Sequence, residues 1–243
     1  HQRRIRATMT SQTSALAVDI ASDKELTARL LGAAGLPVPQ SQSCRTVEQA
    51  VRLAERIGFP VVLKPADGNH GRGVQLDLRT PEAVEQAFDP AKEQARNGRV
   101  IVETFYSGKD YRVLVVGGHM VAVAERVPAH VIGDGEHTVA ELVDIVNSDP
   151  RRGVGHEKVL TRIRVNAAAE ELVAAQGFTM DDVPPLGTEV KLAATGNMST
   201  GGISIDRTYD AHPDNIEIAE EAARVVGLDV AGIDFICPDI AET

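Results

Sequence analysis

A glycine-rich segment between two strand-like runs constrains the fold of this chain most. Residues 64–73 hold three glycines and lie between the apolar runs 61–64 and 74–78. Glycine adopts positive φ angles and lets backbone N–H groups approach an anion closely. A P-loop or a dinucleotide fingerprint needs a helix directly afterwards, whereas a strand follows here. The segment therefore predicts a loop between antiparallel strands that can fold over phosphates, with Lys64 at its base; a hairpin without a ligand is the alternative.

Helix starts are marked by capping residues. In a capping box, a Ser or Thr and the Glu or Gln three residues later satisfy each other's free backbone donors. Three such pairs predict helices, namely Ser22 with Glu25, Thr46 with Gln49, and Thr138 with Glu141. Proline at the first helical position predicts two more, after Thr80 and His212. An Ala- and Glu-rich stretch predicts another helix at 167–176.

The strands are predicted from short β-branched runs. These runs lie at 61–64, 74–78, 100–103, 112–116, 120–126, 189–195, 203–206 and 230–236. Gly117-Gly118 predicts a hairpin, because paired glycines supply the positive φ angles of a tight turn. Helices and strands do not alternate regularly, so we expect an α+β fold. Residues 147–185 show no clear pattern, and we interpret them as an insertion or surface excursion.

Composition disfavours several function classes. The formal net charge is −10 and the chain has 5 Phe, 3 Tyr and no Trp, which disfavours nucleic-acid binding and base-stacking surfaces. Cys44 and Cys237 are too far apart for a metal-ligand spacing, and we expect two buried free thiols in a reducing cytoplasm. No apolar run reaches the ~18 residues of a membrane span, so we expect a soluble protein without a membrane partner. The start at His1 indicates a piece of a longer polypeptide.

The glycine loop is one of a series of motifs along the whole chain. The loop has the sequence Asp-Gly-Asn-His-Gly-Arg-Gly at 67–73. Further motifs lie at 22–27, 102–103, 110–112, 125–131, 133–135, 197–202, 206–208, 212–215 and 231–234. Together they resemble the ATP-grasp superfamily, and within it the cyanophycin synthetases and the bifunctional glutathione synthetases. The Ala129-His130 step and the turn at 149–153 favour the cyanophycin synthetases. The resemblance implies an ATP-grasp fold, in which two α/β subdomains with mainly antiparallel sheets clamp ATP between them.

The resemblance also implies domain boundaries. Residues 1–22 would end a preceding region and linker, 23–105 would form the N-terminal lobe, and 106–243 an incomplete C-terminal lobe with an insertion at 147–188. In the family, a further strand supplies a Glu-x-Asn pair of magnesium ligands, and this sequence stops at Thr243 before it. We therefore expect these residues alone to bind magnesium and turn over ATP poorly. A Mur-ligase-like domain is expected in the full-length protein.

Several residues are implied to bind ATP and Mg²⁺. Lys24 and Lys64 would neutralise phosphates, Glu103 would meet the adenine and Asp110 the ribose. The loop would contribute Gly68, Asn69, His70, Gly71 and Gly73. Asp234 is the one charge on its predicted strand, where a carboxylate needs a cation or donors, and Mg²⁺ is the implied partner. The residues alone leave simpler alternatives open. Lys24 could be a solvated surface lysine, Glu103 and Asp110 could face water, and backbone amides could bind Asp234.

Catalytic and substrate roles follow from the same resemblance. Arg112 and Arg126 lie in valine-rich strands, where a charge is costly unless an anion meets it; substrate, phosphate or a structural Glu stay open as that anion. Relatives usually carry arginine where Ala193 stands. Lys191, two residues earlier and thus expected on the same strand face, would substitute in part. Acceptor contacts are implied for His130, Asn197, Ser199, Gly201, Gly202 and Arg207.

The implied chemistry is amide-bond formation driven by ATP. A carboxylate attacks the γ-phosphate, and an amine then opens the acyl phosphate. For a cyanophycin synthetase-like protein, the carboxylate ends a polyaspartate (cyanophycin) primer, the amine belongs to aspartate, and a homo-oligomer is expected. A glutathione-type amino-acid ligase and a degenerate nucleotide-binding or assembly module stay open as alternatives.

Overall fold

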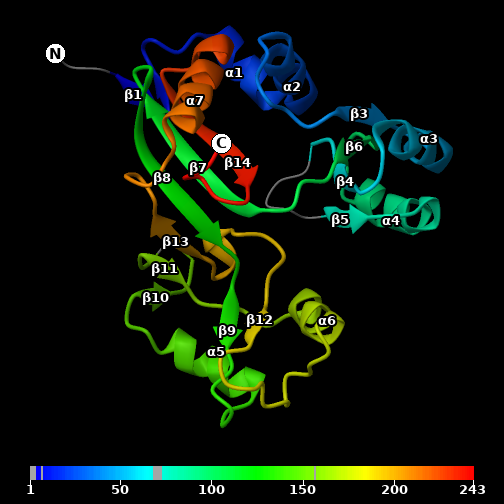
Figure 1. Cartoon of the computed structure of the whole chain (residues 1–243), viewed down its shortest axis with the longest axis vertical. Coiled ribbons are helices and arrows are strands. Elements are labelled where there is room, and N and C mark those ends of the chain that lie inside the picture. The colour runs from blue at the N-terminus through cyan, green and yellow to red at the C-terminus, as the bar shows by residue number, and fades with distance from the viewer. Residues whose placement is uncertain (1–3, 7, 68–72, 156) are drawn as a thin grey trace. The chain divides into compact units, whose positions relative to one another are not determined.

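The computed structural model describes residues 4–6, 8–67, 73–155 and 157–243. The chain divides into two compact units (Figure 1). Unit 1 comprises His1–Gly108, Val113–Ala122 and Asp210–Thr243, and unit 2 comprises Lys109–Arg112 and Val123–Tyr209. The strands β7 (Lys109–Val116) and β8 (His119–Val127) contribute residues to both units. The lobe boundaries implied by the family resemblance stay a prediction.

A four-stranded antiparallel sheet forms the first part of unit 1. Its order is β3 (Ser41–Cys44), β6 (Val100–Thr104), β4 (Val61–Pro65) and β5 (Gln75–Leu78). Two amphipathic helices, α3 (Val47–Ile57) and α4 (Pro81–Glu93), lie side by side and pack against the sheet (Figure 1). Val61, Leu63, Val100 and Val102 meet Phe88 of α4 in a buried core. This packing follows from the strand alternation, because β4 and β6 send every second residue toward the helices.

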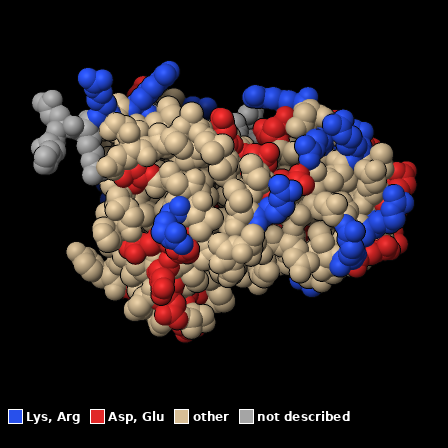
Figure 2. Space-filling model, turned by 90° about the horizontal axis from the view of Figure 1, so that it is seen from above, with Lys and Arg blue, Asp and Glu red and all other residues tan. Residues whose placement is uncertain are grey.

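The outer faces of α3 and α4 are highly charged. Figure 2 shows basic and acidic side chains interspersed at the end of the molecule where these helices lie. On α3 the exposed residues include Glu48, Arg52, Glu55 and Arg56. Mixed signs of this kind suit a solvated helix face and give no single-sign field that would attract a nucleic acid.

Three helices gather in the remainder of unit 1. The helices α1 (Ala15–Ser22), α2 (Lys24–Ala33) and α7 (Pro213–Val226) contact one another, and α7 packs on β14 (Val230–Cys237), the neighbour of β7. A short hairpin of β1 (Ile5–Arg6) and β2 (Met9–Thr10) precedes them. Residues 15–22, expected in a linker, are therefore helical.

The predicted cap of α2 was wrong by one residue. Asp23 is the N-cap, and its carboxylate accepts hydrogen bonds from the backbone N–H groups of Glu25 and Leu26, both at 3.0 Å. Ser22 instead closes α1, where its hydroxyl donates to the carbonyl of Val18. A carboxylate directly before the helix reaches two free donors, whereas a hydroxyl one residue earlier reaches none of them.

Unit 2 is built from short strand pairs and two helices. The antiparallel pairs are β8 with β13 (Ile203–Asp206) and β9 (His130–Ile132) with β12 (Glu189–Lys191), and the parallel pair is β10 (Arg152–Gly153) with β11 (Leu160–Thr161). The helices are α5 (Val139–Asn147) and α6 (Ala167–Ala175), with a 3₁₀ turn, η1, at Met198–Thr200.

The stretch 147–185 belongs to the core of unit 2. Its Ile163, Ala169 and Val173 are buried beside Val131 of β9 and Val190 of β12. The expectation of a surface excursion was therefore wrong. Ala169 and Val173 lie on α6, the helix predicted at 167–176, whereas Ile163 comes from a loop and leaves no regular period that could be recognised in the sequence.

Most other predicted elements are confirmed within one or two residues at their ends. Gly117 and Gly118 have φ angles of +63° and +83°, as the predicted hairpin requires. The strand predicted at 189–195 ends at Lys191. Cys44 is buried but Cys237 is only half-buried, so the expectation of two buried thiols holds for Cys44 alone. Among the described residues, no helix combines the length and apolar character needed to cross a membrane.

Candidate functional site

Lys64 and Glu103 form an ion pair beside the glycine-rich segment. Lys64 Nζ lies 2.7 Å from both carboxylate oxygens of Glu103, and the two side chains are 23% and 19% exposed. The register of β4 and β6 explains the contact: Glu103 lies opposite Val62, and Lys64 is two residues further along the same face. Both residues were predicted to serve ATP. In this structure each is the other's partner.

Lys24 joins this pair at the start of α2. Partial burial and the neighbouring Lys64 ammonium lower the pKa of Lys24 from its ordinary value, while Glu103 and Asp67 act in the opposite direction. Asp67 is itself held by the backbone N–H groups of Arg96 and Asn97, at 3.0 and 3.1 Å. The ammonium groups of Lys24 and Lys64 therefore repel each other near the start of the glycine-rich segment, an arrangement that an added anion stabilises.

Gly73 fits the end of the segment only as glycine. Its φ is +70°, and a Cβ there would lie 2.8 Å from Cβ of Gln94 and 3.1 Å from Cγ of Pro65. The predicted contacts of Gly68, Asn69, His70 and Gly71 lie outside the described residues.

Two ion pairs flank the end of β8 in unit 2. Arg126 Nη2 lies 2.6 Å from Asp110, and Arg207 Nε lies 2.9 Å from Glu125. Glu125 and Arg126 are neighbours on one strand, so their side chains point to opposite faces. The anion that meets Arg126 is therefore the carboxylate of Asp110, and the neighbouring Glu125 pairs with Arg207. Arg112 is exposed on β7.

His130 and Lys191 face each other across β9 and β12. The register pairs these two residues directly, so their side chains share one face. His130 Nδ1 lies 2.8 Å from the carbonyl oxygen of Pro128, which can only accept, so Nδ1 carries the proton. Lys191 is exposed, and its backbone is fixed by hydrogen bonds with the side-chain amide of Gln176.

The predicted face shared by Lys191 and Ala193 was wrong. The strand ends at Lys191, and the N–H groups of Leu192 and Ala193 both donate to the carbonyl of Ala129. This shared acceptor breaks the two-residue alternation. Ala193 packs against the core of unit 2, whereas Lys191 faces solvent.

The segment 197–202 is a tight turn rather than an open cradle. Gly201 has a φ of +96°, and a Cβ there would lie 2.7 Å from Cγ1 of Ile163. A Cβ on Gly202 would lie 2.8 Å from the carbonyl oxygen of Val127. Close packing thus accounts for both glycines. Asn197 is half-buried and Ser199 is exposed, and substrate contacts for these residues stay a prediction.

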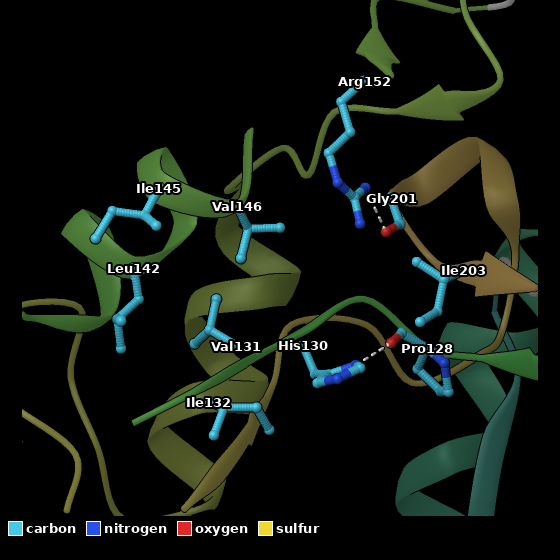
Figure 3. Close-up of a pocket in the computed structure, with 10 residues that line it drawn as sticks. All are labelled: Pro128, His130, Val131, Ile132, Leu142, Ile145, Val146, Arg152, Gly201 and Ile203. Carbon is cyan, nitrogen blue, oxygen red and sulfur yellow. Dashed lines mark hydrogen bonds between the residues drawn. The ribbon is translucent and has the colours of Figure 1, made fainter. Parts of the chain in front are cut away.

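Sequence reasoning missed Arg152. Its side chain is 6% exposed, and Nη1 donates to the carbonyls of Thr161 at 2.6 Å and Gly201 at 2.9 Å (Figure 3). The sequence showed only an Arg-Arg-Gly turn at 151–153. The neighbour Arg151 is exposed and pairs with Asp149, so two adjacent arginines have opposite environments that composition alone does not separate.

Asp234 lies exposed on β14. Across the part of the chain that the structure describes, no group of three or more His, Cys, Asp or Glu side chains could hold a metal ion. A carboxylate-rich Mg²⁺ site needs more oxygen ligands than one aspartate provides. The described residues therefore do not form a complete magnesium site, and the role of Asp234 stays a prediction.

Comparison with known proteins shows what this chain is similar to. A family model for an ATP-grasp domain matches residues 18–117. The whole chain is 49% identical to a cyanophycin synthetase of Crocosphaera subtropica, and it spans 28% of the length of that relative. It is 39% identical over 242 residues to a glutathione biosynthesis bifunctional protein of Mannheimia succiniciproducens, covering 96% of this chain and 31% of the relative.

A solved structure agrees with these sequence matches. The crystal structure of a bifunctional glutathione synthetase from Pasteurella multocida superposes with a TM-score of 0.66 at 34% identity, over 97% of this chain and 32% of the other. The α+β architecture with mainly antiparallel sheets is the one predicted from the sequence. Residues 18–117 therefore match an ATP-grasp domain, and the whole chain is similar to part of the cyanophycin synthetases and of a bifunctional glutathione synthetase.

Proposed function

We propose that this chain serves an ATP-dependent carboxylate–amine ligase, in which unit 1 binds the triphosphate. The observation that carries the proposal is the half-buried Lys64 at the start of the glycine-rich segment, held there by Glu103 and close enough to Lys24 for the two ammonium groups to repel each other. The chain as a whole has a net charge of −10, so an anionic nucleotide requires such a local concentration of positive charge. The similarity to ligases of the ATP-grasp superfamily supports the same reading.

In the proposed binding step, Lys64 exchanges one anionic partner, the Glu103 carboxylate, for another. When a triphosphate enters, Lys64 turns from the Glu103 carboxylate to phosphate oxygens, and Lys24 adds a second positive charge. Glu103 then becomes an acceptor for the exocyclic amine of the adenine. The lowered pKa of Lys24 favours this exchange, because an anion relieves the repulsion from Lys64 that contributes to the shift.

Charge stabilisation is the main task left to the protein during phosphoryl transfer. ATP converts a carboxylate into an acyl phosphate, which an amine can open to an amide. Arg126 and Arg112 are proposed to stabilise the phosphoryl oxygens, with Asp110 holding Arg126 in place at 2.6 Å until substrate arrives. Lys191 and His130, paired across β9 and β12, are proposed to meet the acceptor substrate. No step is assigned to Mg²⁺, because the described residues do not form its site.

The proposed substrates are aspartate and the C-terminal carboxylate of a polyaspartate primer. The support is the 49% identity to a cyanophycin synthetase over the whole chain, against 39% to a glutathione biosynthesis protein. The chain spans about 28% of the first of these relatives, so the native protein carrying this sequence is the proper material for the assay.

The test is phosphate release from ATP by that native protein. We expect release with aspartate plus primer and none with γ-glutamylcysteine plus glycine. Release with only the second pair would identify a glutathione-type ligase instead. Nucleotide binding without release in either mixture would identify a degenerate binding or assembly module, the reading that Ala193 favours because relatives usually have arginine there.

A further inference from the structure

Unit 2 contains a cavity whose lining shares His130 and Gly201 with the proposed acceptor contacts and adds a buried arginine that the proposed ligase chemistry does not use. Its volume is about 320 Å³, and its walls come from β9, α5 and β13. The walls are mainly aliphatic, with Val131, Leu142, Val146 and Ile203 among them, and Arg152 enters from β10 (Figure 3). Ligand pockets in proteins start at roughly this size and combine apolar walls with a few placed polar groups.

Arg152 brings a buried positive charge to this cavity. Its hydrogen-bond partners, the carbonyls of Thr161 and Gly201, are neutral and occupy a single nitrogen of the guanidinium. A guanidinium has five N–H donors, so most of its donor capacity remains for another acceptor. Figure 3 shows the group extending between Gly201 and the aliphatic side chains of the cavity.

Among the residues that the structure describes, no carboxylate lies within ion-pair distance of Arg152. Asp149 is the acidic group that acts on Arg152, but its carboxylate is already held by Arg151, at 2.7 to 3.1 Å. Burial is the main cause that lowers the pKa of Arg152. A buried cation with neutral partners alone is costly, and a carboxylate would form a bidentate pair with it.

The second polar group of the lining is His130. Its Nδ1 donates to the carbonyl of Pro128, so the hydrogen bond fixes the ring beside the aliphatic wall. Figure 3 shows His130 and Arg152 on opposite sides of the lining residues. The cavity thus has one strong anion donor at one side and space lined by methyl groups between the two polar side chains.

We propose that this cavity binds a carboxylate carried on a short aliphatic body, with Arg152 as the anion-binding residue. The carboxylate pairs with the free edge of the guanidinium, and the aliphatic body packs against Leu142, Val146 and Ile203. The site lies wholly within unit 2. It shares His130 and Gly201 with the proposed acceptor contacts, but Arg152 has no role in the proposed ligase reaction and binding needs no ATP, so butyrate binding and phosphate release test the two proposals separately.

Methyl NMR of the chain with added butyrate tests this proposal. Butyrate carries the proposed carboxylate and a short aliphatic tail, and butyramide has the same shape without the charge. We expect saturable shifts of the Leu142, Val146 and Ile203 methyl signals with butyrate, and at least tenfold weaker binding of butyramide. Equal binding of the two compounds, or no saturable shift with butyrate, overturns the proposal and leaves Arg152 as a structural clamp of two carbonyls.

Two kinds of variant separate binding from folding. Arg152→Gln removes the charge but also the clamp, so it can unfold this part of the chain. Ile145 lines the cavity and is 50% exposed, so its replacement leaves the clamp intact. We expect Ile145→Lys to tighten butyrate binding and Ile145→Glu to weaken it, each by about two- to fivefold, as charges at exposed sites do. Identical affinities in both variants contradict an anion in the cavity.

The carboxylate can come from a free acid or from an acidic peptide. An acetylated, amidated tetra-aspartate supplies side-chain carboxylates alone, and butyrate represents a free acid. Shifts of the same methyl signals with both compounds indicate that the cavity accepts acidic side chains of a peptide. Shifts with butyrate alone restrict the site to small free acids.

Discussion

At the scale of single residues, the positive charges of this chain fall into two groups. Lys64, Arg126 and Arg207 have carboxylate partners within 3 Å, namely Glu103, Asp110 and Glu125. Arg152 has only carbonyl partners among its recorded hydrogen bonds. In the proposed function, the first group would exchange a carboxylate partner for substrate, and this exchange would lower the net gain from each new contact.

Lys191 gives the first residue-scale prediction. Because it is exposed and faces His130 across two strands, its ammonium can reach a substrate without breaking an ion pair that holds the fold. We expect Lys191→Ala to lower kcat for phosphate release by about a hundredfold, the low end of the loss when one charge donor is removed. Lys158→Ala, an exposed lysine of the same unit, should leave kcat unchanged. Full turnover in Lys191→Ala would remove this residue from the catalytic set.

The second residue-scale prediction concerns the reactivity of the two cysteines. Burial raises the pKa of the Cys44 thiol to about 11, so below that pH Cys44 stays protonated, and only a thiolate reacts rapidly. Cys237 is half-buried. At about pH 8, near the ordinary thiol pKa, we expect a disulfide reagent to label Cys237 first and Cys44 only after unfolding. Equal labelling rates for both thiols in the native chain would contradict the buried environment of Cys44.

Residue environments were the part that sequence reasoning predicted least well. The ion-pair partners of Arg126 and Glu125 depend on which strand face each residue occupies, and a shift of one residue reverses that choice. Arg151 and Arg152 are chemically identical in the sequence, yet one is exposed and one is buried. Such differences arise from tertiary packing, which local patterns do not encode.

At the scale of elements, capping chemistry decides where the helices begin. Thr138 and Glu141 form a complete capping box at α5: Thr138 Oγ1 accepts from Glu141 N–H, and the Glu141 carboxylate accepts from Thr138 N–H. The prediction from sequence is confirmed here, because the box involves residues only three apart. At α2 the capping-box pattern gave the wrong N-cap. Asp23 lies closer to the free backbone N–H groups of Glu25 and Leu26 and accepts hydrogen bonds from both.

Thr138→Ala tests the energetic role of this box. Loss of the hydroxyl leaves a backbone donor of α5 without its acceptor, so we expect the free energy of unfolding to fall by about 1 kcal/mol. Urea unfolding followed by circular dichroism measures the change. Thr138→Ser keeps the hydroxyl and should retain most of the stability. Equal losses in both variants would show that the methyl group, rather than the cap, matters at this position.

Strand prediction succeeded where runs were apolar and local, as for β4, β6 and β13. It failed after Lys191, where a shared carbonyl acceptor ends the pairing. It also failed across 147–185, where isolated buried side chains such as Ile163 come from irregular backbone. Periodicity reports regular elements, so a core built partly from loops is invisible to it.

At the scale of the whole molecule, the charge balance and the local lysines act in opposite directions. A net charge of −10 repels ATP in general, whereas the ammonium groups of Lys24 and Lys64 are proposed to attract it at one place. The similarity to cyanophycin synthetases could be recognised from the sequence because the shared motifs lie along the whole chain.

The central claim is that Lys64 helps this chain bind ATP, and calorimetric titration of the chain with ATP tests it most directly. Lys64→Met removes the charge, and Lys92→Met removes an exposed lysine of α4 as a matched control. Charge-assisted hydrogen bonds contribute about 1.5–3 kcal/mol, so we expect the Kd of Lys64→Met to rise about ten- to hundredfold. The control should bind like the unaltered chain. Equal ATP affinity in Lys64→Met and the unaltered chain would contradict the account.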